Sequence, residues 1–275
     1  LKHLNRMTEK SPLVRFMKLS ISTLRPPPGR ARIATALAYG VVCHMLFSLA
    51  VLSMIVAMFF GMSMSFGRVP APYATLANTA LILQFPIVHS LLLTSKGKRI
   101  LTRLAPNRHA KTLSSTIYAT IASIQLLTLF ALWTPSGTIW WEASGGVFVA
   151  ICIMYGLSWL LLLWASADAG AEVQSGALGW MSLMQNIKPV FPDMPTRGLF
   201  RIIRQPIYAA FALTTWTVPV WTSDQLFLAV GLTTYCVLAP QLKERRFTKR
   251  YGNRFASYRK KVPYMIPRIF RKPSQ

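Results

Sequence analysis

The stretch GLFRIIRQPIY spans residues 198–208, and the stretch KERRFTKRYGNRFASYRKKVP spans residues 243–263. Between them the chain is apolar, apart from a short polar turn at Thr222-Ser223-Asp224. Such a segment favours two antiparallel helices joined by a tight turn, because Asp224 is the one charged residue in it. A hairpin returns the chain to its starting side, so the sequence predicts that the two polar stretches lie together.

The composition places the chain among membrane proteins. Of its 275 residues, 53% are hydrophobic and 14% are charged, whereas roughly 25% are charged in soluble domains. The net charge of +24 comes from 31 Lys and Arg against 7 Asp and Glu. In a soluble protein this excess would indicate nucleic acid binding. Here the basic residues lie between apolar segments, which instead indicates membrane topology and contact with anionic lipid headgroups, with no nucleic acid partner.

Apolar runs separated by polar loops predict an all-α fold, a polytopic membrane protein of about six transmembrane helices. A C-terminal helical hairpin and a cytoplasmic amphipathic tail complete it. The expected spans are residues 33–60, 73–93, 112–133, 146–167, 206–221 and 225–242. We divide the chain into a basic cytoplasmic arm (1–32), a four-helix transmembrane scaffold (33–167) and a C-terminal part (168–275). That last part begins with a long connection whose middle, 178–187, is compatible with a helix lying on the membrane.

Lysine and arginine are distributed unevenly among the loops. They number 8 in residues 1–32, 6 in 94–111, 4 in 168–205 and 12 after residue 242. The alternate loops hold 1 in 62–72 and none in 134–145 or 222–224. Because basic loops stay on the cytoplasmic side, we expect both termini there. The first apolar run is expected to be a retained anchor and not a cleaved signal peptide.

Single residues inside the apolar runs carry little chemistry of their own. The three cysteines, Cys43, Cys152 and Cys236, are odd in number and form no C-x-x-C pair, so neither a disulfide framework nor a zinc site is indicated. His44 and His89 also lie inside expected spans. A polar residue at that depth is a functional candidate, and a pair of histidines can hold a metal or haem. With no carboxylate partner in the spans, we expect both to be packing residues and predict no metal site.

The polar stretches resemble a known signature. The residues that carry the resemblance are Arg204, Gln205, Pro206 and Tyr208 before the hairpin, and Lys243, Glu244, Tyr251, Gly252, Tyr258 and Pro263 after it. They are similar to the closing signature of the isoprenylcysteine carboxyl methyltransferase superfamily. In that signature an Arg-His-Pro-x-Tyr turn precedes a hairpin, and an acidic pair and an aromatic segment follow it. Here Gln205 stands at the usual His, Lys243 at the first Glu, and Ala210 at a frequent Gly.

The wider layout is most similar to the bacterial methanethiol S-methyltransferase-like branch. Its early markers are the segment Tyr39-Gly-Val-Val-Cys43 and the step from Gln84 to His89-Ser90. The resemblance implies an integral-membrane enzyme that uses S-adenosylmethionine to methylate a small or lipophilic thiol. It also implies a location in the bacterial inner membrane, with the cofactor bound on the cytoplasmic side by the C-terminal part, 168–275. The alternatives are a non-catalytic relative of the same fold, a lipid or isoprenylcysteine methyltransferase, and a sterol-type reductase that uses a nicotinamide.

The resemblance assigns cofactor binding to seven positions and names no catalytic residue. These positions are Arg204, Gln205, Pro206, Tyr208, Glu244, Tyr251 and Tyr258. The chemistry of the cofactor fits the residue types, because its carboxylate needs an Arg fork, its ammonium needs an acid, and its sulfonium and adenine need aromatic faces. A strongly positive rim would also lower the pKa of a thiol substrate.

Glu244 is the most informative of these residues. It is the one acid among the twelve basic residues that follow Leu242. An ion pair along a helix would need a basic residue three or four positions away, and those positions hold Pro240, Gln241, Phe247 and Thr248. We therefore expect a functional acid. If the tail is one helix, Tyr251 and Tyr258 share a face with it, although Gly252 is a candidate bend.

Overall fold

The computed structural model describes residues 12–268, and it is almost entirely helical. Its helices are α2 (Pro12–Ser22), α3 (Arg30–Phe59), α4 (Tyr73–Leu92), α5 (Ser95–Arg103), α6 (Ala110–Ala131), α7 (Gly145–Gln174), α8 (Ala177–Met184), the 3-10 turn η1 (Gly198–Arg201), α9 (Pro206–Trp216), α10 (Ser223–Tyr251) and α11 (Asn253–Lys261). Two short strands, β1 (Ile139–Glu142) and β2 (Val220–Thr222), pair antiparallel. The predicted all-α fold is confirmed.

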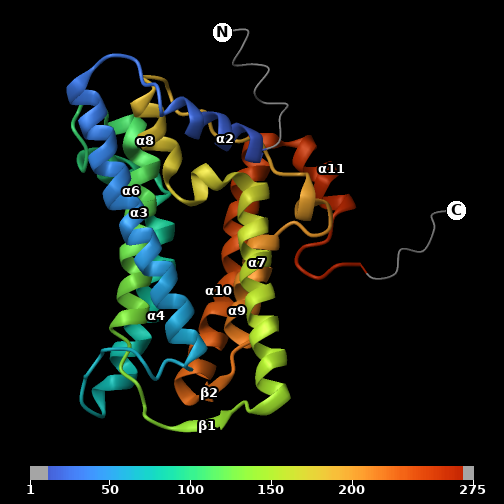
Figure 1. The fold of residues 1–275 in the computed structure, drawn as a ribbon. Coiled ribbons are helices and arrows are strands. Elements are labelled where there is room, and N and C mark those ends of the chain that lie inside the picture. The colour runs from blue at the N-terminus through green and yellow to red at the C-terminus, as the bar shows by residue number, and fades with distance from the viewer. Residues whose placement is uncertain (1–11, 269–275) are drawn as a thin grey trace, which may run out of the picture.

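The long helices stand in two groups (Figure 1). Helices α3, α4 and α6 pack together in one group, and α7, α9 and α10 pack together in the other. Contacts between α4 and α10 join the two groups. Helices α2, α8 and α11 lie at one end of the molecule, here called the α11 end, and the strand pair lies at the other, here called the β end.

Among residues 12–268, five helices are long and apolar enough to cross a membrane: α3, α4, α6, α7 and α10. The sequence predicted six, and the exception is the expected span at 206–221, where the helix is α9. It has 11 residues, or about 16 Å of helix, which is about half of a bilayer core of roughly 30 Å. The chain continues through Pro219 and β2 in extended form, so the first arm of the hairpin is a short helix followed by a strand. The hairpin itself is confirmed, because α9 packs against α10.

The β end is held by an acid at the start of α10. Asp224 is buried, and its Oδ1 accepts a hydrogen bond from Nε1 of the fully buried Trp133 at 3.1 Å. Its Oδ2 accepts from the backbone N–H of Ser136 at 2.7 Å and from the Ser136 hydroxyl at 2.5 Å. A carboxylate in the first turn of a helix is also favoured by the helix dipole. These contacts fix the turn of the hairpin against the segment that follows α6.

The connection that follows the fourth span differs from its prediction in two respects. Helix α7 continues to Gln174 across a kink at Gly170, where φ is 107° and a Cβ would lie 2.8 Å from Cγ of Pro192. Helix α8 forms where a helix was expected, but it is buried among other helices of the protein. All its residues except Trp180 are buried, and it packs against α3 and α6. Gly40 of α3 permits this close approach, because a residue with a side chain at that position would collide with the Trp180 ring.

Candidate functional site

The two polar stretches meet at the α11 end, as the hairpin predicted. Pro206 is the first residue of α9. Proline favours this position, because the backbone N–H of the first helical residue has no partner within the helix and its absence costs nothing. The residue before a proline is held away from the helical region, so the chain enters α9 from an irregular segment. That segment is fastened to the C-terminal tail, because the backbone N–H groups of Arg204 and Gln205 both donate to the carbonyl of Tyr264, each at 3.1 Å.

Arg204 and Glu244 form an ion pair across the hairpin. Nε of Arg204 lies 2.9 Å from Oε1 of Glu244, and Nη2 lies 3.3 Å from Oε2, so the fork is bidentate. Both side chains are largely buried, with 11% and 12% exposed. Nη1 of Arg204 donates to the carbonyls of Val262 at 2.6 Å and Arg259 at 3.3 Å. The sequence was right that Glu244 has no partner along its own helix, and its ion-pair partner comes instead from the other side of the hairpin.

Gln205 links this ion pair to Lys243. Its side chain is buried, with 2% of the residue exposed. Nε2 of Gln205 donates to Oε1 of Glu244 at 2.8 Å, and Oε1 of Gln205 accepts from Nζ of Lys243 at 3.3 Å. An amide donates at one end and accepts at the other, so it bridges the acid and the cation. Two of the three departures from the family signature, Gln205 and Lys243, are therefore in direct contact with each other.

Aromatic rings surround the ammonium group of Lys243. Its Nζ lies 5.6 Å from the centre of the Phe200 ring, 5.9 Å from that of Tyr208 and 5.5 Å from that of Phe247. Such faces attract a positive charge. The site thus has an aromatic side, formed by residues from η1, α9 and α10, next to the polar cluster of Arg204, Gln205, Lys243 and Glu244.

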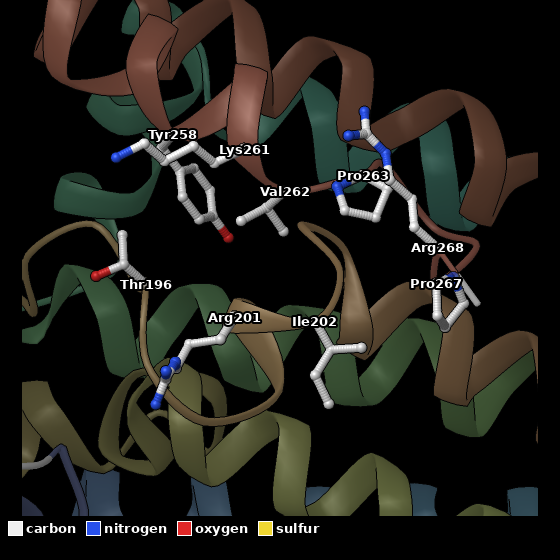
Figure 2. Close-up of a pocket in the computed structure, with 9 residues that line it drawn as sticks. All are labelled: Thr196, Arg201, Ile202, Tyr258, Lys261, Val262, Pro263, Pro267 and Arg268. Carbon is white, nitrogen blue, oxygen red and sulfur yellow. The ribbon is translucent and has the colours of Figure 1, made fainter. Parts of the chain in front are cut away.

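A cavity of about 490 Å³ lies next to this cluster (Figure 2). It is lined in part by Val262, whose carbonyl accepts a hydrogen bond from Arg204. Its lining residues are Thr196, Arg201, Ile202, Tyr258, Lys261, Val262, Pro263, Pro267 and Arg268. Three of these nine are cations and none is an acid, so the cavity is positively charged. In Figure 2 the ring of Tyr258 and the side chain of Val262 point toward the space between α11 and the segment that carries Thr196 and Arg201.

Tyr258 is held in this cavity as a neutral hydrogen-bond donor. Its hydroxyl donates to the carbonyl of Phe200 at 2.6 Å. Burial of the phenol raises the pKa of Tyr258 to about 12, with the nearby Glu244 acting in the same direction and Arg204 opposing it. The phenol therefore remains protonated at neutral pH and ties α11 to η1.

The structure brings together most of the residues predicted from the sequence, with one exception. Arg204, Gln205, Pro206, Tyr208 and Glu244 form one group, and Tyr258 lies in the adjoining cavity. Tyr251 touches none of the four polar residues; its ring centre lies 5.4 Å from that of Phe247, beside Arg250 and the exposed Asp193–Arg254 ion pair. Gly252, with φ of 51°, separates α10 from α11. The expected single helical face shared by Glu244, Tyr251 and Tyr258 is therefore wrong.

Several contributors were missed by reasoning from the sequence. Tyr264 accepts two backbone hydrogen bonds with its carbonyl, and its ring lies 5.4 Å from the guanidinium carbon of Arg204. The carbonyl of Val262 is a second such contributor. Backbone acceptors carry no side-chain signature, so no pattern in the sequence marks them. Arg201, Lys261 and Arg268 were counted with the other basic residues of the loops, and only their common cavity distinguishes them.

The two histidines inside the spanning helices have different surroundings. Nε2 of His44 accepts a hydrogen bond from Nε1 of Trp180 at 3.0 Å, so His44 is a packing residue, as predicted. His89 packs between the rings of Phe85 and Tyr118, and its Nδ1 is buried without a hydrogen-bond partner in the part of the chain that the structure describes. The three cysteines are free. Within residues 12–268 no group of three or more His, Cys, Asp or Glu is placed to hold a metal ion.

Comparison with known proteins supplies several relatives. The chain is 28% identical over 200 residues to methanethiol S-methyltransferase 2 of Bradyrhizobium diazoefficiens. The matched residues make up 72% of this chain and 74% of that protein. It is 26% identical over 203 residues to the methanethiol S-methyltransferase of Pseudomonas deceptionensis, covering 74% and 76%. It is also 26% identical over 177 residues to nurim of Rattus norvegicus, covering 61% and 66%. No family model and no solved structure matches the chain.

These relatives confirm the resemblance to the family. Their similarity extends over about 200 residues, which is much longer than the closing signature. The five apolar helices found in the described residues support a location in a membrane. The chain is an integral membrane protein homologous to the methanethiol S-methyltransferases, in keeping with the isoprenylcysteine carboxyl methyltransferase superfamily.

Proposed function

We propose that this protein is an integral-membrane methyltransferase that transfers a methyl group from S-adenosylmethionine to methanethiol or a similar small or lipophilic thiol. The observation that carries the proposal is the cluster of Arg204, Gln205, Lys243 and Glu244, assembled from the two ends of the hairpin. The names of the relatives supply the reaction. The cluster is formed by the two polar stretches whose resemblance to the family signature implies a cofactor site.

The chemistry of the cluster and its cavity fits S-adenosylmethionine. When bound, this cofactor supplies an electrophilic methyl group on a positively charged sulfur. The cations Arg201, Lys261 and Arg268 line a cavity without an acid and suit its carboxylate. The rings around Lys243 already face one positive charge and suit a sulfonium. Within this site we assign direct contacts to Tyr208 and Tyr258, and polar contacts to Gln205 and Glu244.

The role of Arg204 is different from the carboxylate fork expected at first. Four of its hydrogen bonds go to Glu244, Val262 and Arg259. A guanidinium has five N–H donors, so little capacity remains for a ligand. We propose that Arg204 holds Glu244 and the segment 259–264 in place as a wall of the cofactor site, and that Pro206 fixes the turn. Tyr251 stays a prediction that no contact with the cluster supports.

The chain's contribution to catalysis would be alignment and charge. Methyl transfer between sulfur atoms is an in-line displacement, and holding the reactants in line is worth much of the barrier. The excess of cations at the α11 end favours a thiolate over a neutral thiol. We place the α11 end and both termini on the cytoplasmic side of a bacterial inner membrane, where basic loops contact anionic headgroups. No nucleic acid partner is proposed.

Calorimetric binding tests the proposal directly. Purified protein in detergent is titrated with S-adenosylmethionine and with S-adenosylhomocysteine, and NADPH serves as the control for a reductase. Headspace gas chromatography then measures dimethyl sulfide formed from methanethiol. We expect binding of the first two ligands in the micromolar range and formation of dimethyl sulfide. Binding of NADPH alone, or no binding of either adenosyl ligand, would overturn the proposal.

A non-catalytic relative is the second candidate. It is favoured by the way Arg204 and Glu244 satisfy each other and by the contact between Gln205 and Lys243, which together make a closed network without a ligand. This candidate predicts cofactor binding without methyl transfer to methanethiol, longer alkanethiols, prenylcysteines or lipids. Transfer to a prenylcysteine but not to methanethiol would instead assign the lipid-modifying activity.

A further inference from the structure

A row of aromatic side chains runs from the polar cluster into the membrane-spanning part of the molecule. It begins at Tyr208, over which Lys243 lies, and continues to Tyr235 of α10 at 6.3 Å between ring centres. Phe85 of α4 lies 5.7 Å from Tyr235, and His89 stacks on Phe85 at 5.0 Å. The row therefore connects the proposed cofactor site with a histidine on a different helix group.

His89 has an unexplained nitrogen. Its ring packs between Phe85 and Tyr118, with the Tyr118 ring centre 4.8 Å away. The Tyr118 hydroxyl donates to the backbone carbonyl of His89 at 3.3 Å and not to the imidazole. Nδ1 is buried, and among residues 12–268 it has no hydrogen-bond partner. A buried ring nitrogen without a partner costs free energy, and in native structures such a group calls for an explanation, of which a catalytic role is one.

The charged and titratable groups around His89 come from three helices. Arg246 of α10 lies within electrostatic range of His89, and also of Tyr118, Tyr208 and Tyr235. Tyr118 is contributed by α6, Tyr235 by α10 and Tyr208 by α9. Within residues 12–268 no ion pair joins His89 to a carboxylate. An anion formed next to this histidine would therefore be stabilised by Arg246.

A groove on the outside of the spanning helices leads to the same row. It has a volume of about 570 Å³, lies between α4 and α10, and is lined by Pro86, Ser90, Tyr235 and Leu238 among others. Tyr235 belongs both to the groove and to the aromatic row. Of the groove residues of α4, Pro86 lies three positions before His89 and Ser90 directly follows it. Because α4 and α10 are spanning helices, the groove faces the bilayer, where a small apolar thiol dissolves.

We propose that His89 is the proton acceptor for the thiol substrate, in an acceptor site bounded by Phe85, Tyr118, Tyr208 and Tyr235. This inference rests on the proposed function and deepens it. The S–H bond of the thiol breaks and its proton passes to the imidazole of His89. The electron pair left on sulfur forms the new S–C bond while the methyl group leaves its sulfonium, whose sulfur keeps the pair of the broken bond. The histidine proton is then lost to solvent.

Two thiols of similar size and different acidity test this role. Ethanethiol depends on a base at neutral pH, whereas 2,2,2-trifluoroethanethiol ionises much more readily. We expect His89→Gln to lower kcat for ethanethiol by about 100-fold or more, and to lower it far less for the fluorinated thiol. Raising the pH should restore part of the ethanethiol rate. The matched control is His44→Gln, a histidine in another span whose partner is Trp180, which should leave the ratio of the two rates unchanged.

A second measurement needs no methyl transfer. Trifluoroethanethiol is bound to protein that is saturated with S-adenosylhomocysteine, and the ultraviolet absorbance of its thiolate is followed with pH. The wild-type protein should hold the thiolate at a lower pH than His89→Gln does. Calorimetry of S-adenosylhomocysteine confirms that the variant keeps its fold.

Identical thiolate titrations in the two proteins, or an equal loss of rate for both thiols, would overturn the role of His89. If the wild-type protein methylates neither thiol, the proposed function fails instead, and the thiolate titration still decides whether His89 accepts the proton.

Discussion

Helix α10 carries one acid near each end, and the two acids are used differently. Asp224, at the β end, is satisfied by three neutral donors from Trp133 and Ser136, which lie within one short segment. Glu244, at the α11 end, is satisfied by the guanidinium of Arg204 and the amide of Gln205. Both are largely buried and fully hydrogen-bonded, so burial and bonding do not distinguish them.

The surroundings of the two acids do distinguish them. Glu244 has Arg204 and Lys243 close by, and a cavity lined by three further cations lies behind its partner. Asp224 has no cation among its hydrogen-bond partners in the described residues. The Asp224 site holds one carboxylate among neutral donors, and its three hydrogen bonds fasten the β end. The other keeps an excess of positive charge and open space, and these are the features that a negatively charged ligand group requires.

The strongest way to break this comparison is Glu244→Ala. It leaves Arg204 without its anion, and removing one partner of a buried pair costs about 3–5 kcal/mol. We expect lower thermal stability and cofactor binding weaker by about 100-fold, a change that corresponds to roughly 3 kcal/mol. Thermal unfolding and calorimetry in detergent measure the two effects. Glu142→Ala, which removes an exposed acid of β1, is the matched control. Unchanged cofactor binding would show that Glu244 serves structure alone.

Asp224→Asn should affect stability and leave binding intact. The asparagine keeps one acceptor but turns an amide group toward a donor, and a buried donor left unsatisfied costs about 1–3 kcal/mol. The melting temperature should fall, while the folded protein should bind S-adenosylmethionine with the affinity of the wild type. A loss of affinity without a loss of stability would contradict the assignment of Asp224 to the fastening of the β end.

The contact between Gln205 and Lys243 sharpens the comparison further. Lys243→Glu alone places a carboxylate against the Oε1 of Gln205 and next to Glu244, so it should weaken the cluster. Adding Gln205→His restores the family pattern, and we expect the two changes to be coupled by about 1 kcal/mol, within the range for residues in contact. A double-mutant cycle on cofactor affinity measures the coupling. Strictly additive effects would mean that the two departures from the signature are independent.

Tyr258→Phe should give the smallest effect. It removes the hydrogen bond to the Phe200 carbonyl, worth about 0.5–1.5 kcal/mol. The pKa of Tyr258 is raised from its ordinary value of 10 to about 12, so its proton stabilises the folded state below pH 10. That contribution is lost as the pH rises through 12. Wild-type protein should therefore lose stability over this interval more steeply than Tyr258→Phe in chemical unfolding, and parallel curves would count against the bond.

The general plan could be predicted from the sequence, because it follows from hydropathy and from charge. Apolar runs marked the spanning helices, and the uneven distribution of Lys and Arg marked one end of the molecule as basic. The turn at Thr222-Ser223-Asp224 required a hairpin, and the hairpin brought Arg204 to Glu244. Each of these steps depends on side-chain properties that the sequence alone gives.

What could not be predicted depends on packing and on backbone groups. The short α9 looks as apolar as a full span, yet it ends at Trp216, and the chain after it pairs with β1 as strand β2. The burial of α8 depends on Gly40, which lies far away in the sequence. The carbonyl of Tyr264 gives no signal at all. Gly252 was visible as a candidate bend, yet its effect on Tyr251 needed the actual backbone conformation.

The two cavities have consequences for how the proposed enzyme would meet its substrates. The cavity behind Arg204 lies at the α11 end, whereas the groove at Tyr235 lies between two spanning helices, and they share no lining residue. A water-soluble cofactor and a bilayer-soluble thiol then arrive from different phases without obstructing each other, and neither must leave before the other binds. Such an enzyme follows ternary-complex kinetics with no compulsory order. Its apparent KM for the thiol scales with the amount of lipid or detergent present, because the hydrophobic phase, and not the water, sets the concentration that the groove encounters.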